Sequence, residues 1–172
     1  MLLDEFVAID FETANASRVS ACSVGIALYR GGKLATQEYL IRPPELRFDR
    51  RNIAVHGITP EMVRDAPTFM ELFPEIRDYL DAASIWAHYA PFDQGVLNAL
   101  ARHYRVPLPI SLECTCRLSR RLYPGLPSHS LPIVCGHLGI TLTHHNAKSD
   151  AEACARIVLA SQGAGQPVCR GQ

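Results

Sequence analysis

The chain has 172 residues, of which 48% are hydrophobic and 20% charged, a composition typical of one globular domain. Its 17 basic and 17 acidic residues give a net charge of +0, which argues against a protein that coats long nucleic acid by bulk electrostatics. A locally basic groove for a short chain end remains compatible with this balance. The N-terminal run MLLDEF predicts no signal peptide, and no membrane span is expected, so a cytoplasmic protein is expected.

The first part of the chain predicts an antiparallel meander of three strands. Buried strands are expected over Phe6–Phe11 and Ala21–Tyr29, and the pair Gly31-Gly32 is a strong hairpin signal leading into a third strand, Leu34–Ile41. The segment Arg42–Asn52 contains two prolines and several arginines, so it is predicted to be a surface loop.

After this loop, helices and short strands alternate. Elements are expected in this order: a helix start at Thr59–Pro60, a helix over Thr68–Leu80, a strand over Ser84–His88, a helix over Phe92–Tyr104, a strand over Ile110–Glu113, and helices over Arg117–Leu122, Leu131–Leu138 and Ala147–Ala160. The pattern predicts an α/β fold with a mixed five-stranded sheet, in which the meander is joined by parallel strands and helices cover both faces. Residues 1–162 are expected to form one domain, followed by a flexible tail over 163–172.

The first strand ends in two carboxylates. In the stretch VAIDFET, Asp10 and Glu12 are two residues apart, so their side chains point to the same face of the strand. Two like charges on one face repel each other, and burial increases the repulsion unless a cation lies between them. The pair therefore indicates either a metal site or a strand end that is open to water.

Two further acids occupy predicted helix starts. Asp93 follows the strand Ser84–His88, and Asp150 lies in the first turns of the last helix. Each one alone is best explained as an acid favoured at the positive end of a helix dipole. Together with Asp10 and Glu12, they favour a cluster of oxygen ligands for Mg²⁺ or Mn²⁺, in the two-ion arrangement that serves phosphodiester cleavage.

Three short runs carry a resemblance to a known family: IDFET at 9–13, HYAPFD at 88–93 and HNAKSD at 145–150. In this order and spacing they are similar to the three motifs of the DEDDh (DnaQ-like) 3′–5′ exonuclease superfamily. The nearest likeness is to the proofreading epsilon subunit of bacterial DNA polymerase III and its stand-alone relatives, and it extends from Phe6 to about Ala160. The resemblance implies a ribonuclease H-like fold.

The resemblance also implies a role for five residues. Asp10, Glu12, Asp93 and Asp150 are expected to bind two divalent cations, Mg²⁺ or Mn²⁺. His145 is expected to act as the general base that takes a proton from the attacking water. A histidine suits this task because its unperturbed pKa of about 6.5 leaves it neutral at working pH.

Three further residues are expected to contact the substrate. Thr13 follows the first acidic pair and would seat the terminal nucleotide, and His56 belongs to the run VHGIT, which resembles a loop flanking the substrate cleft. Lys148, inside the third motif, would contact a phosphate. The chain departs from the family pattern at Ala14-Asn15, where many members have a glycine, and this changes how closely the backbone approaches the terminal base.

The expected function is a metal-dependent 3′–5′ exonuclease that releases nucleoside 5′-monophosphates from single-stranded DNA, in proofreading or repair. A polymerase or a repair protein is the expected type of partner, and the oligomeric state is left open. Two alternatives stay open as well. One is an exoribonuclease that trims RNA ends or degrades short oligoribonucleotides, since sugar choice depends on contacts to the 2′-OH. The other is a catalytically silent module that binds nucleic acid or protein.

Overall fold

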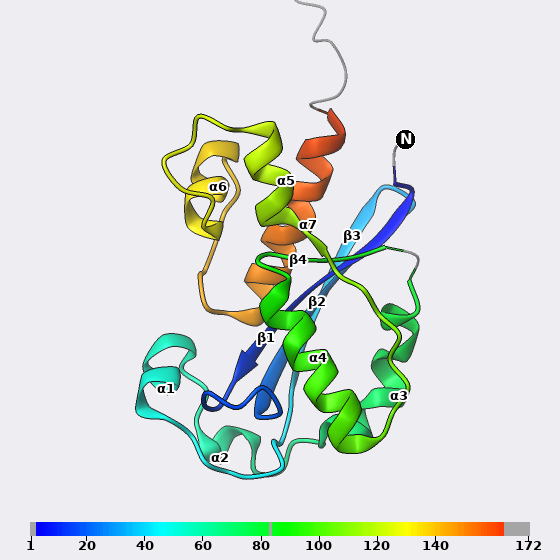
Figure 1. Cartoon of the computed structure of the whole chain (residues 1–172), viewed down its shortest axis with the longest axis vertical. Helices are drawn as coiled ribbons and strands as arrows, with labels where there is room; N and C mark the ends of the chain where they lie inside the picture. The colour runs from blue at the N-terminus through cyan, green and yellow to red at the C-terminus, as the bar shows by residue number, and fades with distance from the viewer. Residues whose placement is uncertain (1–2, 83, 164–172) are drawn as a thin grey trace, which may run out of the picture.

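The structure, a computed structural model, describes residues 3–82 and 84–163. Residues 164–172 of the tail predicted over 163–172 lie outside the described residues. Five strands form one sheet in the order β3-β2-β1-β4-β5 (Figure 1). The strands are β1 (Glu5–Thr13), β2 (Ala21–Arg30), β3 (Lys33–Leu40), β4 (Ile85–Ala87) and β5 (Glu113–Cys114). The first three pair antiparallel, whereas β4 runs parallel to β1 and β5 parallel to β4, which confirms the predicted mixed sheet.

Helices lie on both faces of the sheet and at its ends. They are α1 (Arg50–His56), α2 (Pro60–Val63), α3 (Phe69–Leu80), α4 (Pro91–Tyr104), α5 (Thr115–Leu122), α6 (Leu131–Leu138) and α7 (Ala147–Gly163). The helices α3 and α4 pack on one face, and α7 packs on the other. Figure 1 shows α5 and α6 beside α7 at one end of the molecule, with α1 and α2 at the opposite end, toward which β1 runs.

The alternation of side chains along β1 separates two cores. Val7, Ile9 and Phe11 point to the α3–α4 face, where they contact large apolar side chains such as Phe69. Phe6 and the small residue Ala8 point to the α7 face. Asp10 and Glu12 continue this second series, because residues two apart on a strand share a face. The central strand therefore delivers its two carboxylates to the side that α7 covers.

The α7 face carries several small side chains beside Phe6 and Val158. Buried residues of this kind are Ala8 and Ala27 on the strands and Ala151, Cys154 and Ala155 on the helix. At the register position opposite Asp10 stands Gly25. A Cβ atom at Gly25 would lie 1.9 Å from the carbonyl oxygen of Ala147, so only glycine lets the start of α7 rest directly on β2. The five cysteines among the described residues are free, and four of them are buried.

The surface loop predicted over Arg42–Asn52 is wrong at its end, where α1 begins at Arg50. This helix has no buried residue, so its sequence shows no apolar stripe that would predict it. Two hydrogen bonds join it to β1: the side chains of Asn52 and His56 reach the carbonyl oxygen of Thr13. Such long-range hydrogen bonds leave no local pattern in the sequence.

The strand predicted over Ile110–Glu113 is also wrong, because the structure has the strand later, at Glu113–Cys114. The reason is the side chain of Gln94 on α4. Its amide nitrogen donates to the carbonyl oxygen of Ile110 at 2.9 Å, and its amide oxygen accepts the backbone N–H of Leu112 at 2.9 Å. The backbone that would have extended the strand is bonded to a helix instead. In the part of the chain that the structure describes, no helix is both long and apolar enough to cross a membrane.

Candidate active site

Three carboxylates from two elements converge at one end of β1. Asp10 and Glu12 lie on β1, and Asp150 lies in the first turn of α7. One carboxylate oxygen from each of these three residues lies within 4.8 Å of the others. Asp150 lies far from the other two in the sequence, and the close contact of α7 with β2 at Gly25 brings it over β1. These three form what we call the acid cluster.

Asp93 joins the acid cluster from the opposite face of the sheet. It lies in the first turn of α4 and is buried, and its Oδ1 accepts the backbone N–H of Phe11 at 3.0 Å. Burial raises the pKa of Asp93, while the hydrogen bond from Phe11 and the charge of Arg18 lower it. The charge of Asp93 in turn raises the pKa of Asp10. It therefore adds a fourth carboxylate beside the three that approach one another most closely.

The electrostatics of the acid cluster call for a cation. Burial, followed by the charges of neighbouring carboxylates, raises the pKa of Asp10 well above its usual range. The same causes raise the pKa of Glu12 to about 8. Among the described residues, Oδ1 of Asp150 is buried with no hydrogen-bond partner. Hard oxygen donors, mutual repulsion and an orphaned buried oxygen all fit a divalent cation.

Two stacked histidines border the acid cluster. The rings of His144 and His145 are stacked, with centroids 3.7 Å apart. Nδ1 of His144 donates to Oδ2 of Asp150 at 3.0 Å, and the backbone N–H of His145 donates to the same oxygen at 3.1 Å. His145 has a φ of 65°, a strained conformation for a residue other than glycine. The structure thus brings the predicted base to the acid cluster, and it adds His144, which the sequence analysis did not select.

The predicted substrate residues Thr13 and His56 lie together beyond Glu12. Thr13 is buried, and its carbonyl oxygen accepts hydrogen bonds from Asn52 at 2.7 Å and from Nε2 of His56 at 3.2 Å. Nδ1 of His56 accepts the backbone N–H of Ile58 at 3.0 Å. Both ring nitrogens of His56 are therefore hydrogen-bonded to the backbone of the protein. Asn52 and His56 together hold the end of β1 in place. Asn52 was not predicted from the sequence as a site residue because it lay in a predicted loop.

Lys148 lies apart from these residues. Its side chain is exposed and lines a cavity bordered by Thr143, Glu152 and Arg156, on the outer side of α7. Its backbone belongs to the contact with Gly25, where a Cβ atom would lie 2.6 Å from the nitrogen of Lys148. Gly25 could have been noted in the sequence as a glycine inside a strand, a signal for close backbone approach.

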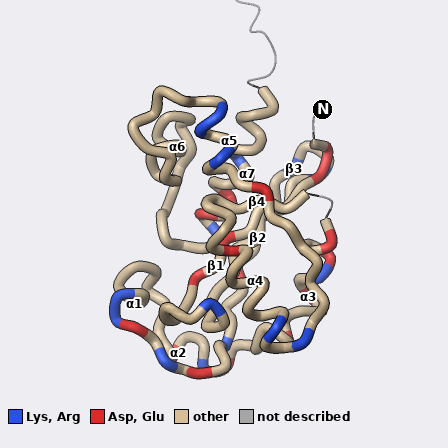
Figure 2. Tube along the Cα trace, in the orientation of Figure 1, with Lys and Arg blue, Asp and Glu red and all other residues tan. Residues whose placement is uncertain are grey.

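A pocket of about 390 Å³ opens directly beside the acid cluster. Asp10, Asp150 and His144 line it together with Tyr89 and Arg120. In Figure 2, basic segments lie on α5 and near α1, at opposite ends of the molecule, and acidic segments lie between them. A polyanion that crossed the acid cluster from α5 to α1 would meet positive charge on both sides.

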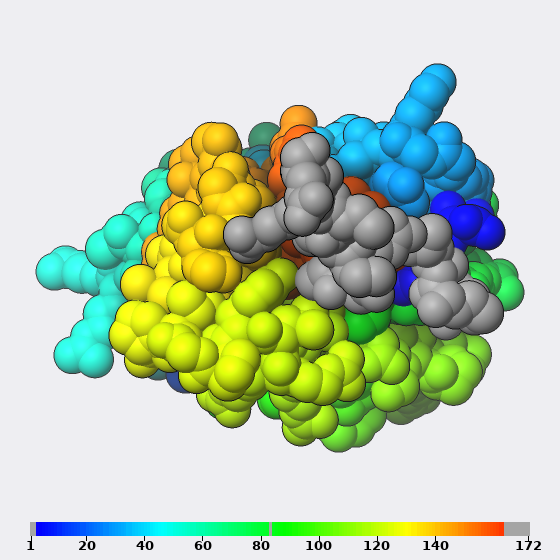
Figure 3. All heavy atoms as spheres, turned by 90° about the horizontal axis from the view of Figure 1, so that it is seen from above, coloured from blue at the N-terminus to red at the C-terminus, as the bar shows by residue number. Residues whose placement is uncertain are grey.

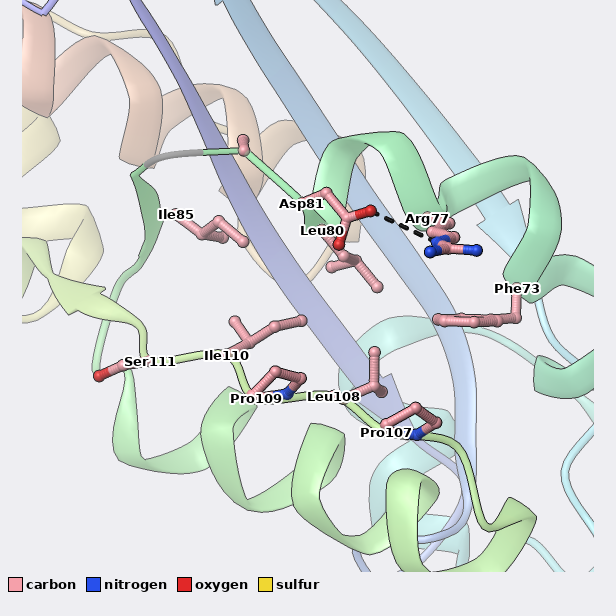
Figure 4. Close-up of a pocket in the computed structure, with 11 residues that line it drawn as sticks. Phe73, Arg77, Leu80, Asp81, Ile85, Pro107, Leu108, Pro109, Ile110 and Ser111 are labelled. Atoms are coloured by element: carbon pink, nitrogen blue, oxygen red, sulfur yellow. Dashed lines mark hydrogen bonds and ion pairs between the residues drawn. The ribbon is translucent and has the colours of Figure 1, made fainter.

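A second cavity, of about 750 Å³, lies away from this site (Figure 4). It is formed by the end of α3 and the segment 107–111, with Phe73, Leu80 and Ile110 as apolar lining and the Arg77–Asp81 ion pair at 3.4 Å. None of the sequence-predicted site residues lines it.

The fold and the site together define a nuclease of the ribonuclease H-like class, with an acid cluster suited to divalent cations. The family model of the RNase T exonucleases matches residues 7–158, and the chain belongs to this family, within the DEDDh (DnaQ-like) 3′–5′ exonuclease superfamily. The family and the enzyme class predicted from the sequence are confirmed.

Curated relatives include polymerase components. The chain is 30% identical over 172 residues to DNA polymerase III subunit epsilon of Haemophilus influenzae, covering 91% of this chain and 67% of that subunit. It is 33% identical over 159 residues to the PolC-type DNA polymerase III of Oceanobacillus iheyensis. That match covers 90% of this chain and 11% of the relative, so the chain spans only a small part of the longer polymerases.

Solved structures share the fold. Exonuclease X in complex with 5′ overhanging duplex DNA superposes with a TM-score of 0.76 at 24% identity, covering 93% of this chain and 92% of that one. The nuclease domain of 3′hExo, a DEDDh family member bound to rAMP, gives a TM-score of 0.76 at 19% identity, covering 94% and 93% of the two chains. Their similarity confirms the ribonuclease H-like fold.

Proposed function

We propose that this exonuclease hydrolyses the last phosphodiester bond at the 3′ end of single-stranded DNA and releases nucleoside 5′-monophosphates. The observation that carries the proposal is the acid cluster, in which oxygens of Asp10, Glu12 and Asp150 lie within 4.8 Å of one another at the end of β1. Asp93 adds a fourth carboxylate. Two divalent cations, Mg²⁺ or Mn²⁺, are the proposed cofactors, held by these four residues.

The bound cations would polarise the scissile phosphate and stabilise the leaving oxygen. The protein itself holds the carboxylates in place before the substrate arrives. Phe11 fixes Asp93 through its backbone N–H, and His144 and the backbone of His145 fix Asp150. Prearranged groups of this kind lower the barrier because they need no reorganisation during the reaction.

The proposed general base is His145, which takes the proton from the attacking water. Burial and the neighbouring His144 lower the pKa of His145 below its usual value, which keeps the ring neutral near pH 7. A neutral imidazole can accept a proton, whereas an imidazolium cannot. The stacking contact with His144 limits the orientations that the His145 ring adopts.

The terminal nucleotide is proposed to bind beyond Glu12, at Thr13. His56 serves this subsite by fixing the carbonyl oxygen of Thr13, since both of its ring nitrogens are already bonded. Lys148 is proposed to attract the phosphate backbone through its charge, from the outer side of α7.

We propose DNA rather than RNA as the substrate because the chain is similar to the epsilon subunit and to Exonuclease X, which was solved with DNA. A 3′–5′ exoribonuclease is the second candidate, because 3′hExo, which shares the fold, was solved with rAMP. A polymerase as partner, and a role in proofreading or repair, follow from the first likeness as proposals.

The test uses matched single-stranded DNA and RNA oligonucleotides with a fluorescent label at the 5′ end. Purified protein is incubated with Mg²⁺, Mn²⁺ or EDTA, and products are resolved by length. We expect a ladder that shortens from the 3′ end, release of 5′-monophosphates, no reaction in EDTA, and a higher rate on DNA.

The matched control is Asp81→Asn, since Asp81 is an exposed acid at the end of α3, far from the acid cluster. Asp10→Asn should abolish the ladder, and Asp81→Asn should leave it unchanged. Cleavage that persists in EDTA or in Asp10→Asn would overturn the proposal. A faster reaction on RNA would transfer it to the second candidate.

A further inference from the structure

Tyr89 has an unusual backbone and an unusual exposure. It stands between β4 and α4, with a φ of 64°, and 61% of the residue is exposed. Glycine, asparagine or aspartate adopt this left-handed region at less cost, whereas a bulky residue there is an outlier. Neither the strain nor the exposure of a large aromatic ring benefits the fold. Strained residues of this kind cluster at binding sites, where a ligand contact offsets the cost.

The ring lies on the pocket beside the acid cluster. This pocket contains Asp10 and Asp150 from the acid cluster, Tyr89 at the start of α4, and Arg120 on α5. Its volume of about 390 Å³ is within the range of sites for small molecules. Figure 3 views the molecule from the end at which α5 and α6 lie. The segments of α5 and α6 are adjacent there and form one continuous face.

The wall of the pocket is held rigidly. Nε2 of His88 bonds the carbonyl oxygen of His129 at 3.0 Å, and its Nδ1 bonds the hydroxyl of Thr115 at 2.9 Å. The hydroxyl of Ser119 bonds Nδ1 of His129 at 3.0 Å. These bonds tie the segment before α6 to β4 and α5, so the pocket exists before any ligand binds. Preformed sites lose less entropy on binding.

We propose that this pocket binds the penultimate nucleotide of the substrate, with its base stacked on Tyr89 and its phosphate bound to Arg120. The inference rests on the proposed function, in which the terminal nucleotide lies at Thr13 and the scissile phosphate lies at the acid cluster. The next nucleotide must then lie on the other side of the acid cluster, where Asp10 and Asp150 border this pocket. An exposed aromatic ring stacks on any base, and the guanidinium of arginine suits phosphate.

Binding is measured by fluorescence anisotropy with a 5′-labelled thymidine octanucleotide, in an Asp10→Asn background that keeps the probe intact. A second probe lacks only the penultimate base. We expect Tyr89→Ala to weaken binding of the intact probe by about 5- to 150-fold, the range for loss of one stacked base. The loss should vanish with the abasic probe, and Tyr89→Phe, which keeps the ring, should bind both probes as the parent does.

Tyr89→Asn separates a binding role from a structural one. Asparagine tolerates the left-handed backbone, so this variant should have a higher melting temperature than the parent. It should nevertheless bind the intact probe as weakly as Tyr89→Ala does. In the active protein, the same variants should raise KM more than they lower kcat. Met70→Ala, which removes an exposed side chain of α3, is the matched control and should change neither binding nor kinetics.

Equal losses with the intact and the abasic probe would overturn the proposal, as would unchanged binding by Tyr89→Asn. Failure of the proposed function looks different. In that case the parent protein does not shorten oligonucleotides, while the base-dependent difference between Tyr89 variants can still be measured by anisotropy. Unchanged binding after Arg120→Ala, together with a base-dependent Tyr89 effect, would overturn the phosphate contact alone.

Discussion

The two faces of the central sheet are built from different side chains. The α3–α4 face has a core of large residues, among them Ile9, Phe11 and Phe69. The α7 face has four alanines and Cys154 among its buried residues, beside Phe6 and Val158, with Gly25 at the point where α7 begins. The acid cluster lies on the second face.

This difference separates stability from function. Large buried side chains supply most of the hydrophobic free energy of folding. Small ones let a helix approach a sheet closely, and here they allow Asp150 on α7 to reach Asp10 on β1. We therefore expect substitutions on the first face to act on the free energy of unfolding and substitutions on the second to act on catalysis.

The largest expected effect comes from Asp10→Asn. It removes a ligand of the proposed metal site, so kcat should fall by at least about 10³-fold. The melting temperature in EDTA should stay the same or rise, because burial and neighbouring charges disfavour the ionised carboxylate of Asp10. Hydrolysis assays and calorimetry measure the two quantities. A parallel loss of activity and stability would break the distinction between the faces.

On the other face, Phe69→Ala should lower the free energy of unfolding by about 3–5 kcal/mol, since it leaves a cavity in the large core. Denaturant unfolding measures this change. Below the unfolding transition, kcat should equal that of the parent. A kcat that falls in the fully folded variant would contradict a purely structural role for this core.

Gly25→Ala tests the close approach of α7. The new Cβ would lie 1.9 Å from the carbonyl oxygen of Ala147, so the start of α7 must move away. We expect a loss of about 1–3 kcal/mol in stability and of about 10²-fold in kcat, the effect of a displacement near 1 Å.

The control for this variant is Gly136→Ala on α6, where no heavy atom other than those of the adjoining residues and the helix's own backbone lies within 4 Å of the added Cβ. It should leave kcat unchanged. Full activity of Gly25→Ala would show that the position of α7 tolerates more shift than the packing suggests.

Two variants of His144 separate the effect of its hydrogen bond to Asp150 from the effect of its stacking on His145. His144→Phe keeps the stacked ring and loses the hydrogen bond to Asp150, so Mn²⁺ affinity measured by calorimetry should fall by about 10- to 100-fold. His144→Asn retains an N–H donor and loses the stack, so it should keep metal affinity better while kcat falls. The same response from both variants would mean that His144 acts through only one contact.

A further expected effect is a pH dependence of the metal-free protein. Burial, followed by the charge of Asp150, raises the pKa of Glu12 in the folded state to about 8, above its value in the unfolded chain. The folded state therefore binds more protons, and stability is highest below the unfolded pKa of about 4.5 and falls as pH rises through about 8. Melting temperatures in EDTA should decrease between about pH 5 and pH 8. Glu12→Gln should make the melting temperature less dependent on pH. Mg²⁺ should raise the melting temperature of the parent protein most at high pH. A flat curve for the parent protein would contradict the raised pKa.

Local signals in the sequence predicted most of the fold. The Gly31-Gly32 turn and the apolar periodicity of α3 each encode their element within a few residues, and the structure has both. The structure adds a capping box at Thr68. The errors at α1 and β5 share a cause. Both depend on hydrogen bonds between distant residues, such as Asn52 to Thr13, which no local pattern records.

For the site, the sequence identified carboxylates by their residue type, because buried acids need a chemical reason. Residues whose importance is geometric were not identified from the sequence. Gly25 is important because it has no Cβ atom, and Tyr89 is important because its φ angle is positive. The hydrogen bonding of His56 likewise became apparent only from the folded geometry.

Cys154 allows the opening of α7 to be measured by chemical labelling. Its thiol lies fully buried between α7 and the sheet, and burial raises its pKa, so a thiol reagent cannot reach or activate it in the closed protein. Labelling at this position requires α7 to separate from the strands. The labelling rate at Cys154, read by mass spectrometry, therefore reports how often the helix that carries Asp150 opens, without any substrate.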